Sequence, residues 1–357
     1  MREDLMKVKV CGTGLLLYLT YPNECISYSF KVNSARKYLR FRDFLHYFSQ
    51  MVPKRIGSET WSLAWAYIRE IDDVIDRPRL SRRRQLEILD KEWEVVRKCF
   101  DNEYEFRSGE HLRYLWLQQF IDNVHRFYDK SIIYIVKELY ESARMDAERR
   151  WIILSDGIMR NLLYKKAVCF FKLYFTLCGF KEAYIDKIAE DLGIALGMLD
   201  DILDLVYDLR GGYINVTRDE LERLGIEADP RDSRFIEELL RKGYFRIKGI
   251  EILRLLLRAR KLAWRLRNEL LRKLVLRLTE VFAAPILEDR FIPGERYFFK
   301  GGRILLRLLP SNEEVAYRIG HRLIAYVLSF PQISSVLMKT WLRLVGDSCG
   351  EDRDSRI

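Results

Sequence analysis

The stretch from residue 195 to 221, ALGMLDDILDLVYDLRGGYINVTRDEL, most constrains what this chain can fold into. Asp200, Asp204 and Asp208 follow one another at intervals of four residues. At about 100° per residue, this spacing places the three carboxylates in one stripe along a helix. A second stripe is apolar, and it contains Leu196, Leu199, Leu203 and Val206. The pattern predicts one amphipathic helix, which the glycines at 211 and 212 should end.

Carboxylates stacked at this spacing repel one another by a few tenths of a kcal/mol per pair on an exposed helix. No lysine stands four residues further on to balance them. We therefore expect a compensating positive charge at this stripe, and a divalent cation would supply one.

A second acidic helix is predicted upstream, in AWAYIREIDDVIDRP. Asp72 and Asp76 are again four residues apart, Asp73 lies beside the first, and Arg69 comes one turn earlier. Pro78 should stop this helix soon afterwards. Two such helices can face each other across a cavity and hold Mg²⁺, or Mn²⁺ in its place. Mg²⁺ suits the arrangement because it combines a few carboxylates with the phosphate oxygens of a substrate.

With these residues in view, the chain resembles the squalene/phytoene synthase family of head-to-head prenyl transferases. The family's first acidic motif reads approximately Arg-x-x-Asp-Asp-x-x-Asp and is matched by Arg69, Asp72, Asp73 and Asp76. Its second reads approximately Asn-x-x-x-Asp-x-x-x-Asp-x-Arg-x-Gly and is matched by Asp204, Asp208, Arg210 and Gly212, with Asp200 in place of the usual Asn.

Two further segments carry the same resemblance. The segment ESARMDAERRW is similar to the family's middle Gly-Met-x-x-Asp stretch, with Asp146 as the counterpart of its aspartate. The segment TRDEL, residues 217–221, is similar to the family's PQDEL. Order and spacing agree over about residues 47–221.

The resemblance implies an all-α fold, a single domain over residues 1–357 with helices around a central cavity. Residues 1–33 would form an N-terminal arm, and 351–357 a frayed tail. It also implies Mg²⁺-dependent condensation of two prenyl diphosphates. Diphosphate leaves an allylic donor, the double bond of the second substrate attacks the cation, and a cyclopropyl intermediate then rearranges. Whether NADPH is required is open.

Roles for individual residues follow from the resemblance. The predicted catalytic aspartates are Asp72, Asp76, Asp204 and Asp208. The predicted metal ligands are Asp72, Asp73, Asp76, Asp200, Asp204 and Asp208. The predicted contacts to substrate are Arg69, Arg210, Asp146, Lys165, Lys166 and Phe170, the two arginines because a guanidinium offers a fork matched to phosphate oxygens. Asp146 contacts a metal-bound water or orients Arg149; both roles are open.

The chain also departs from the family pattern. RDFLHYFSQ stands where the family has a Ser-Lys-Ser-Phe-like phosphate segment, and residues 166–173 carry bulk where the family has glycines. Phe170 would then occupy volume that a second prenyl chain needs, or else it lies in packed core. A single-substrate enzyme like a class I terpene synthase is therefore one alternative. Another is a catalytically silent member of the family that acts as a binding or assembly protein.

Composition sets the remaining expectations. The chain has 357 residues, a net charge of +10 and six scattered cysteines that form no zinc pattern. The charge permits contact with nucleic acid, anionic lipid or phosphorylated substrates. Nucleic-acid binding is not expected, because the leucines in the Arg-rich region 246–277 give that region a buried stripe. No run reaches the length of a membrane span, which predicts a cytoplasmic protein able to touch a membrane surface.

Overall fold

The computed structural model describes residues 28–42, 55–75, 80–105, 111–232 and 234–287. These residues form helices joined by turns, and no strand occurs among them. The predicted all-α class is therefore confirmed. Of the predicted N-terminal arm, residues 28–33 belong to the first helix, and the predicted tail lies outside the described residues.

The chain divides into two compact units, and each is described by itself. Unit 1 contains residues 1–144 and 173–180, and unit 2 contains residues 145–172 and 181–357. The described helices of unit 1 are α1 (Tyr28–Arg42), α3 (Arg55–Ile75), α4 (Arg82–Phe100), α5 (Leu112–Phe127) and most of α6 (Ile132–Glu148). The second part of α8 (Cys169–Leu177) also belongs to unit 1.

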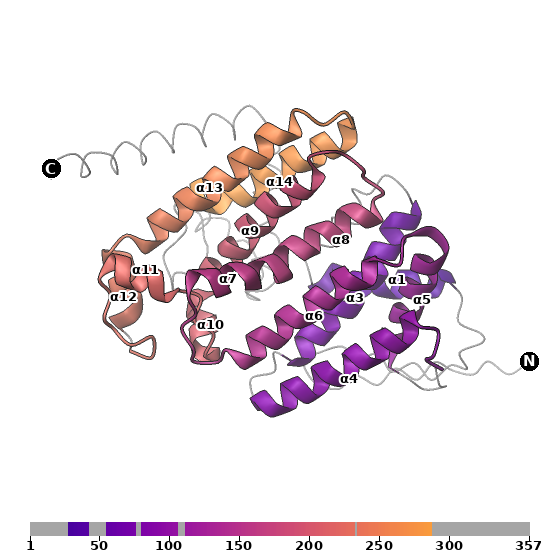
Figure 1. Ribbon diagram of the computed structural model, residues 1–357, viewed down its shortest axis with the longest axis horizontal. Helices are drawn as coiled ribbons and strands as arrows, with labels where there is room; N and C mark the ends of the chain where they lie inside the picture. The colour runs from indigo at the N-terminus through magenta and orange to yellow at the C-terminus, as the bar shows by residue number, and fades with distance from the viewer. Residues whose placement is uncertain (1–27, 43–54, 76–79, 106–110, 233, 288–357) are drawn as a thin grey trace, which may run out of the picture. The chain divides into compact units, whose positions relative to one another are not determined.

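Helix α3 is the centre of unit 1, because it packs against α1, α4 and α5 (Figure 1). Its apolar face consists of large aromatic and aliphatic side chains, of which Trp61 and Leu63 are fully buried. The sequence suggests Ser58 or Thr60 as the residue that caps this helix. That prediction is wrong, since the helix already begins at Arg55, and the Thr60 hydroxyl instead donates to the carbonyl of Ile56 at 2.7 Å.

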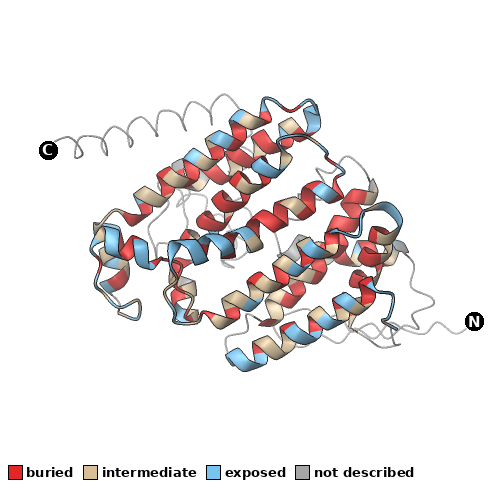
Figure 2. Ribbon diagram, in the orientation of Figure 1, coloured by how far each residue is buried: buried red, intermediate tan, exposed pale blue. Residues whose placement is uncertain are grey.

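Unit 2 is built around α9 (Ile185–Leu203), which packs against five other elements. These are α7 (Asp156–Leu163), the π-helix η2 (Tyr164–Val168), α10 (Leu205–Gly211), α13 (Tyr244–Ala263) and α14 (Glu269–Leu287). Figure 2 shows that α9 is buried over much of its length. Its apolar positions recur every three or four residues and bury Ile188, Leu192, Ala195, Leu199 and Ile202.

Two short helices complete unit 2, α11 (Arg218–Leu224) and α12 (Arg234–Arg241). A capping box starts α11: the Thr217 hydroxyl accepts from the backbone of Glu220, and the Glu220 side chain accepts from the backbone of Thr217. Gly225 ends α11 at a φ of 59°, in the left-handed region that glycine tolerates best. The TRDEL segment is therefore a well-specified helix start in this chain.

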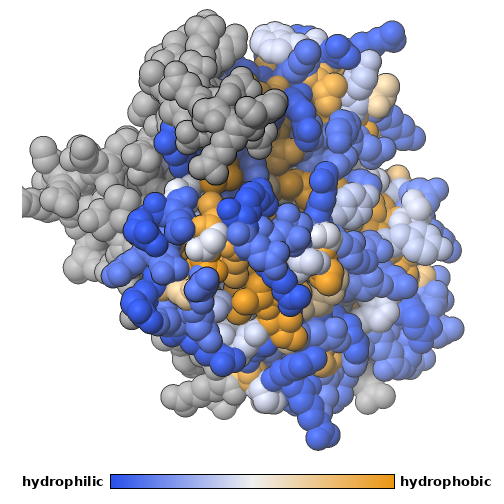
Figure 3. Space-filling view, turned by 60° about the vertical axis from the view of Figure 1, so that its left-hand side comes forward, coloured by the Kyte–Doolittle hydropathy of each residue, from blue (hydrophilic) through white to orange (hydrophobic). Residues whose placement is uncertain are grey.

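The surface seen in Figure 3 interleaves hydrophilic side chains with exposed hydrophobic ones. This agrees with a composition that is 49% hydrophobic and 32% charged. Among the helices that the structure describes, none combines the length and the apolar character needed to cross a membrane.

Candidate active site

The second acidic motif lies at the junction of α9 and α10. The sequence predicts one continuous helix here, but the helix is interrupted at Asp204, whose φ and ψ are −96° and 4°. The hydrogen bonds nevertheless keep their four-residue step: Asp204 N donates to Asp200 O at 2.9 Å, and Asp208 N donates to Asp204 O at 2.8 Å. Asp200 and Asp204 are exposed, while Asp208 is half-buried.

Asp208 is held by a hydrogen bond from outside the second acidic motif. Its Oδ2 accepts a hydrogen bond from the Asn215 amide at 2.6 Å. The pKa of Asp208 is raised from 3.8 to about 7, mainly by burial; Lys166 opposes this shift, and Asp201 and Asp204 add to it. Burial therefore disfavours the ionised form of this carboxylate.

The pKa of Asp201 is raised in the same way, although neither acidic motif includes this residue. Burial raises the pKa of Asp201 to about 7, Lys166 and Arg149 oppose that shift, and Asp200 adds to it. Two adjacent carboxyls with raised pKa values in one region are typical of functional sites. The Asp-Asp doublet at 200–201 is the sequence signal that could have drawn attention to it.

Arg149 joins two separate parts of the sequence in unit 2. Its Nε donates to Asp146 Oδ1 at 2.6 Å, at the end of α6. Its Nη1 donates to the carbonyl of Ile214 at 2.9 Å, and its Nη2 donates to Asn215 Oδ1 at 2.7 Å. Burial would lower the pKa of Arg149, but the charges of Asp146 and Asp201 raise it on balance. Arg149 therefore stays charged although only 6% of it is exposed.

These contacts form a continuous chain of side chains from Asp146 through Arg149 and Asn215 to Asp208. The middle segment and the second acidic motif are thus parts of one site. Asp146 accepts a hydrogen bond from Arg149, and its role in the site stays a prediction. Asn215 has no local sequence signal of its own, because only the fold brings it between Arg149 and Asp208.

The predicted phosphate-contacting lysines lie in the π-helix η2, where Lys165 is half-buried and Lys166 is exposed. Lys166 Nζ lies 3.9 Å from Asp200 Oδ2. A pair so exposed adds little to stability. A single π-helical turn within α-helical structure is frequent at functional sites. Arg210, on α10, is also exposed.

Two glycines of α9 allow η2 and the end of α7 to approach this helix closely. A Cβ at Gly193 would lie 2.6 Å from Val168 Cα, and a Cβ at Gly197 would lie 2.6 Å from Leu163 Cδ2. The close approach of α9 to η2 therefore requires these glycines. Phe170 is 3% exposed, and its ring meets Phe171 edge-on at 5.1 Å. Its predicted contact with substrate stays a prediction.

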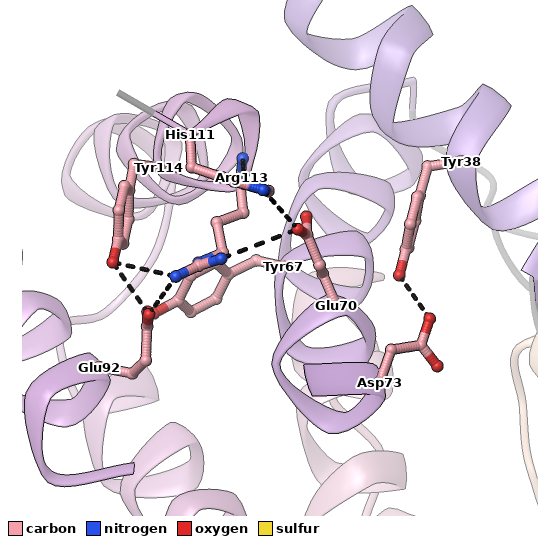
Figure 4. A network of polar contacts seen from close by, with 8 residues as sticks. All are labelled: Tyr38, Tyr67, Glu70, Asp73, Glu92, His111, Arg113 and Tyr114. Carbon is pink, nitrogen blue, oxygen red and sulfur yellow. Dashed lines mark hydrogen bonds and ion pairs between the residues drawn. The ribbon is translucent and has the colours of Figure 1, made fainter. Parts of the chain in front are cut away.

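The first acidic motif belongs to α3 in unit 1. Arg69 Nη1 donates to Asp72 Oδ2 at 2.5 Å, and Arg69 Nη2 lies 3.7 Å from Asp73 Oδ1. The hydroxyl of Tyr38, on α1, donates to Asp73 Oδ2 at 2.9 Å (Figure 4). Asp76 lies outside the described residues. The expectation that the two acidic motifs share one cavity stays a prediction.

The donor set was compared with what Mg²⁺ requires. In the part of the chain that the structure describes, no three carboxylate, imidazole or thiol side chains are gathered as a preformed metal site. Mg²⁺ often takes only one or two carboxylates and completes its shell with water and substrate phosphates. The carboxylates at 200, 204 and 208 fit that mode, because they are hard oxygen donors.

Comparison with known proteins places these residues in a family. The model of the squalene/phytoene synthase family matches residues 45–278, which include both acidic motifs and the middle segment. No curated protein sequence matches the chain.

Two solved structures share the fold. One is a dehydrosqualene synthase in complex with ligand, with a TM-score of 0.60 and 13% identity over 78% of this chain and 94% of that one. The other is the squalene synthase HpnC from Alicyclobacillus acidocaldarius, with a TM-score of 0.59 and 18% identity over 76% of this chain and 96% of that one. At these identities the likeness concerns the fold, and it confirms the predicted isoprenoid-synthase-like architecture. Because the family model covers more than half of its length, the chain belongs to the squalene/phytoene synthase family.

Proposed function

We propose that the protein is a Mg²⁺-dependent prenyl transferase that condenses two prenyl diphosphates head to head and releases diphosphate. The family supplies the reaction class. The observation that carries the proposal is the chain of contacts from Asp146 through Arg149 and Asn215 to Asp208. It holds a carboxylate of the second acidic motif in a partly dry environment, next to residues able to bind phosphate.

The electrostatics of unit 2 support a dianionic ligand bound together with a cation. Asp208 and Asp201 resist ionisation near neutral pH, so they gain most from a cation that binds beside them. Lys166, on η2, and Arg210, on α10, carry positive charge and are exposed to solvent. Carboxylates for the metal and basic groups for phosphate are the two halves of a diphosphate site.

Each residue then has a defined task. Asn215 occupies one oxygen of Asp208 and fixes the direction of the other. Arg149 fixes Asn215 in turn, and Lys166 and Arg210 hold the phosphate oxygens as the allylic bond breaks. Bound Mg²⁺ would supply charge neutralisation of the leaving diphosphate. Arg69, paired with Asp72, is the matching phosphate contact on the first acidic motif.

The proposal is tested by incubating the protein with C10, C15 and C20 prenyl diphosphates and Mg²⁺. Released diphosphate is measured, and the extract is analysed by mass spectrometry. Asp72→Ala and Asp204→Ala should abolish diphosphate release while the folded fraction stays unchanged. Asp186→Ala removes an exposed carboxylate from the first turn of α9 and serves as the matched control. If either Asp72→Ala or Asp204→Ala turned over normally, the substituted aspartate would not be a metal ligand.

A single-substrate reaction, like that of a class I terpene synthase, is the second candidate. It is supported by the burial of most of the segment from 168 to 175, where residues 168–171 and 173–175 are each at most 3% exposed. Counting prenyl units in the product decides between the two reactions. A product with the carbon number of one substrate would replace the head-to-head proposal. If no substrate releases diphosphate, the protein is a catalytically silent family member that acts as a binding or assembly protein.

A further inference from the structure

A second polar network, outside the residues that the family motifs assign, surrounds α3 in unit 1 (Figure 4). Its centre is Arg113, in the first turn of α5. Arg113 Nη2 lies 2.6 Å from Glu92 Oε1 on α4, and Arg113 Nη1 lies 3.8 Å from Glu70 Oε1 on α3. His111 Nε2 lies 3.1 Å from the same oxygen of Glu70. The network therefore joins α3 to the N-terminus of α5 and to the middle of α4.

Tyrosine hydroxyls donate the remaining hydrogen bonds to Glu92 in this network. Tyr67, on α3, donates to Glu92 Oε2 at 2.9 Å, and Tyr114 donates to Oε1 at 2.9 Å. The hydroxyl of Tyr140, on α6, donates to that of Tyr67 at 2.9 Å. Glu92 is 3% exposed, and Glu70 is 7% exposed. Buried carboxylates with this many directed partners fix the relative placement of the helices that carry them.

The network is attached to the face of α3 that lies opposite Asp72. At about 100° per residue, Asp72 lies about 140° around the helix from Tyr67 and about 160° from Glu70. Asp73 lies between the two faces, and there Tyr38 of α1 holds it at 2.9 Å. Figure 4 shows the two attachments on different sides of the helix, with Tyr38 on one side and Arg113 on the other. Rotation of α3 about its axis would break both.

We propose that Tyr38 is a positioning residue for Asp73 and that the Glu70–Arg113–Glu92 network fixes the rotation of α3. Together they hold the first acidic motif in the orientation in which it meets its ligand. The inference rests on the proposed function for the nature of that ligand, diphosphate with Mg²⁺. The rotational restraint itself is a property of the protein without ligand.

Two variants test the two attachments. Tyr38→Phe removes the hydroxyl on Asp73 and keeps the ring, which packs against Trp116 at 5.2 Å. Glu70→Gln keeps the shape of the side chain and removes the charge that Arg113 and His111 face. The matched control is Tyr128→Phe, which removes a hydroxyl that donates to the carbonyl of Leu177 at 3.0 Å, elsewhere in unit 1.

Calorimetry with inorganic diphosphate gives the Mg²⁺ concentration for half-maximal binding. We expect this concentration to rise about threefold to tenfold in Tyr38→Phe and in Glu70→Gln, as the loss of one directed contact predicts. Tyr128→Phe should leave this Mg²⁺ concentration unchanged, even if its melting temperature falls as much as those of Tyr38→Phe and Glu70→Gln. Equal Mg²⁺ requirements in the wild type and both variants would overturn the proposal.

Hydrogen exchange without ligand separates this inference from the proposed function. The backbone amides of residues 69–75 should exchange about threefold faster or more in Tyr38→Phe and Glu70→Gln than in the wild type and in Tyr128→Phe. If the wild type binds no diphosphate, the proposed function fails, while faster exchange in the two variants alone still supports the restraint. Unchanged exchange in both variants would refute the restraint, whatever the protein binds.

Discussion

The backbone N–H of Trp151 donates to the carbonyl of Gly212 at 2.7 Å, and the indole of Trp151 covers the same glycine. Gly212 has a φ of 87°, and a Cβ there would lie 2.8 Å from the indole Nε1. The residue that ends the second acidic motif is thereby fixed against the last residue of the middle segment. Glycine is required for two independent reasons, the positive φ and the lack of space.

The first prediction follows from this contact. Gly212→Ala should lower the free energy of unfolding by about 2 kcal/mol, since alanine at a positive φ costs about 1 kcal/mol and the clash adds to it. Urea unfolding followed by circular dichroism measures the change. Gly157→Ala, where a Cβ meets nothing within 4 Å, is the control and should be close to neutral. Equal stability of the two variants would show that a Cβ at Gly212 does not clash with Trp151.

The second prediction compares the two glycines of α9 that face η2. Gly193→Ala should be the more destabilising change, by about 1–3 kcal/mol, because its Cβ would meet the backbone of Val168. Gly197→Ala should cost less, because the atom in its way is the end of the flexible Leu163 side chain. The two melting curves give the order. The reverse order would show that α9 can shift away from the backbone of η2.

The third prediction concerns Asn215. Asn215→Ala leaves the Arg149 fork and Asp208 each without one partner in a buried setting, which should cost about 1–3 kcal/mol of unfolding free energy. It should also slow diphosphate release, because Asp208 loses the group that orients it. Asn161→Ala, an exposed change on α7, is a fitting control for both measurements. A variant that is less stable but fully active would confine Asn215 to a structural role.

The fourth prediction is a pH dependence. The pKa of Asp208 is raised from 3.8 to about 7 in the folded protein, so the folded state binds the proton more tightly than the unfolded state does. This contribution to stability is fully present below about pH 4 and is lost as the pH rises towards 7. Asp208→Asn should therefore raise the melting temperature by about 2 °C or more at pH 8, without Mg²⁺. At pH 4 the wild type and the variant should melt within about 1 °C of each other. A difference that is independent of pH would contradict the raised pKa.

The fifth prediction concerns Phe170. Its burial against Phe171 indicates that Phe170→Ala removes core packing and should cost about 3–5 kcal/mol of unfolding free energy. If the ring only packs, the product profile stays that of the wild type. A longer preferred substrate with little loss of stability would instead show that Phe170 borders the prenyl chain. One melting curve and one product analysis separate the two outcomes.

The sequence by itself determined the helical class and the identity of the acidic stripes. Periodic apolar residues are a local signal, and so are the four-residue steps from Asp200 to Asp208 and the glycine that ends α10. Spacing along one helix depends only on the geometry of that helix, so these features were readable without any tertiary contact. The break at Asp204 could not be predicted from the sequence. Only the backbone dihedrals of Asp204 depart from helical values, while the hydrogen bonds on both sides keep their four-residue step.

Only the tertiary structure decided which polar groups meet. Asn215 bridges Arg149 and Asp208 across separations of 66 and 7 residues, and Arg113 joins Glu70 and Glu92 from a third helix. The raised pKa of Asp208 likewise depends on burial and on Asp201 and Asp204 beside it. Such contacts arise from packing between elements that are distant in sequence. A pattern of residue types carries no information about them until the helices are packed.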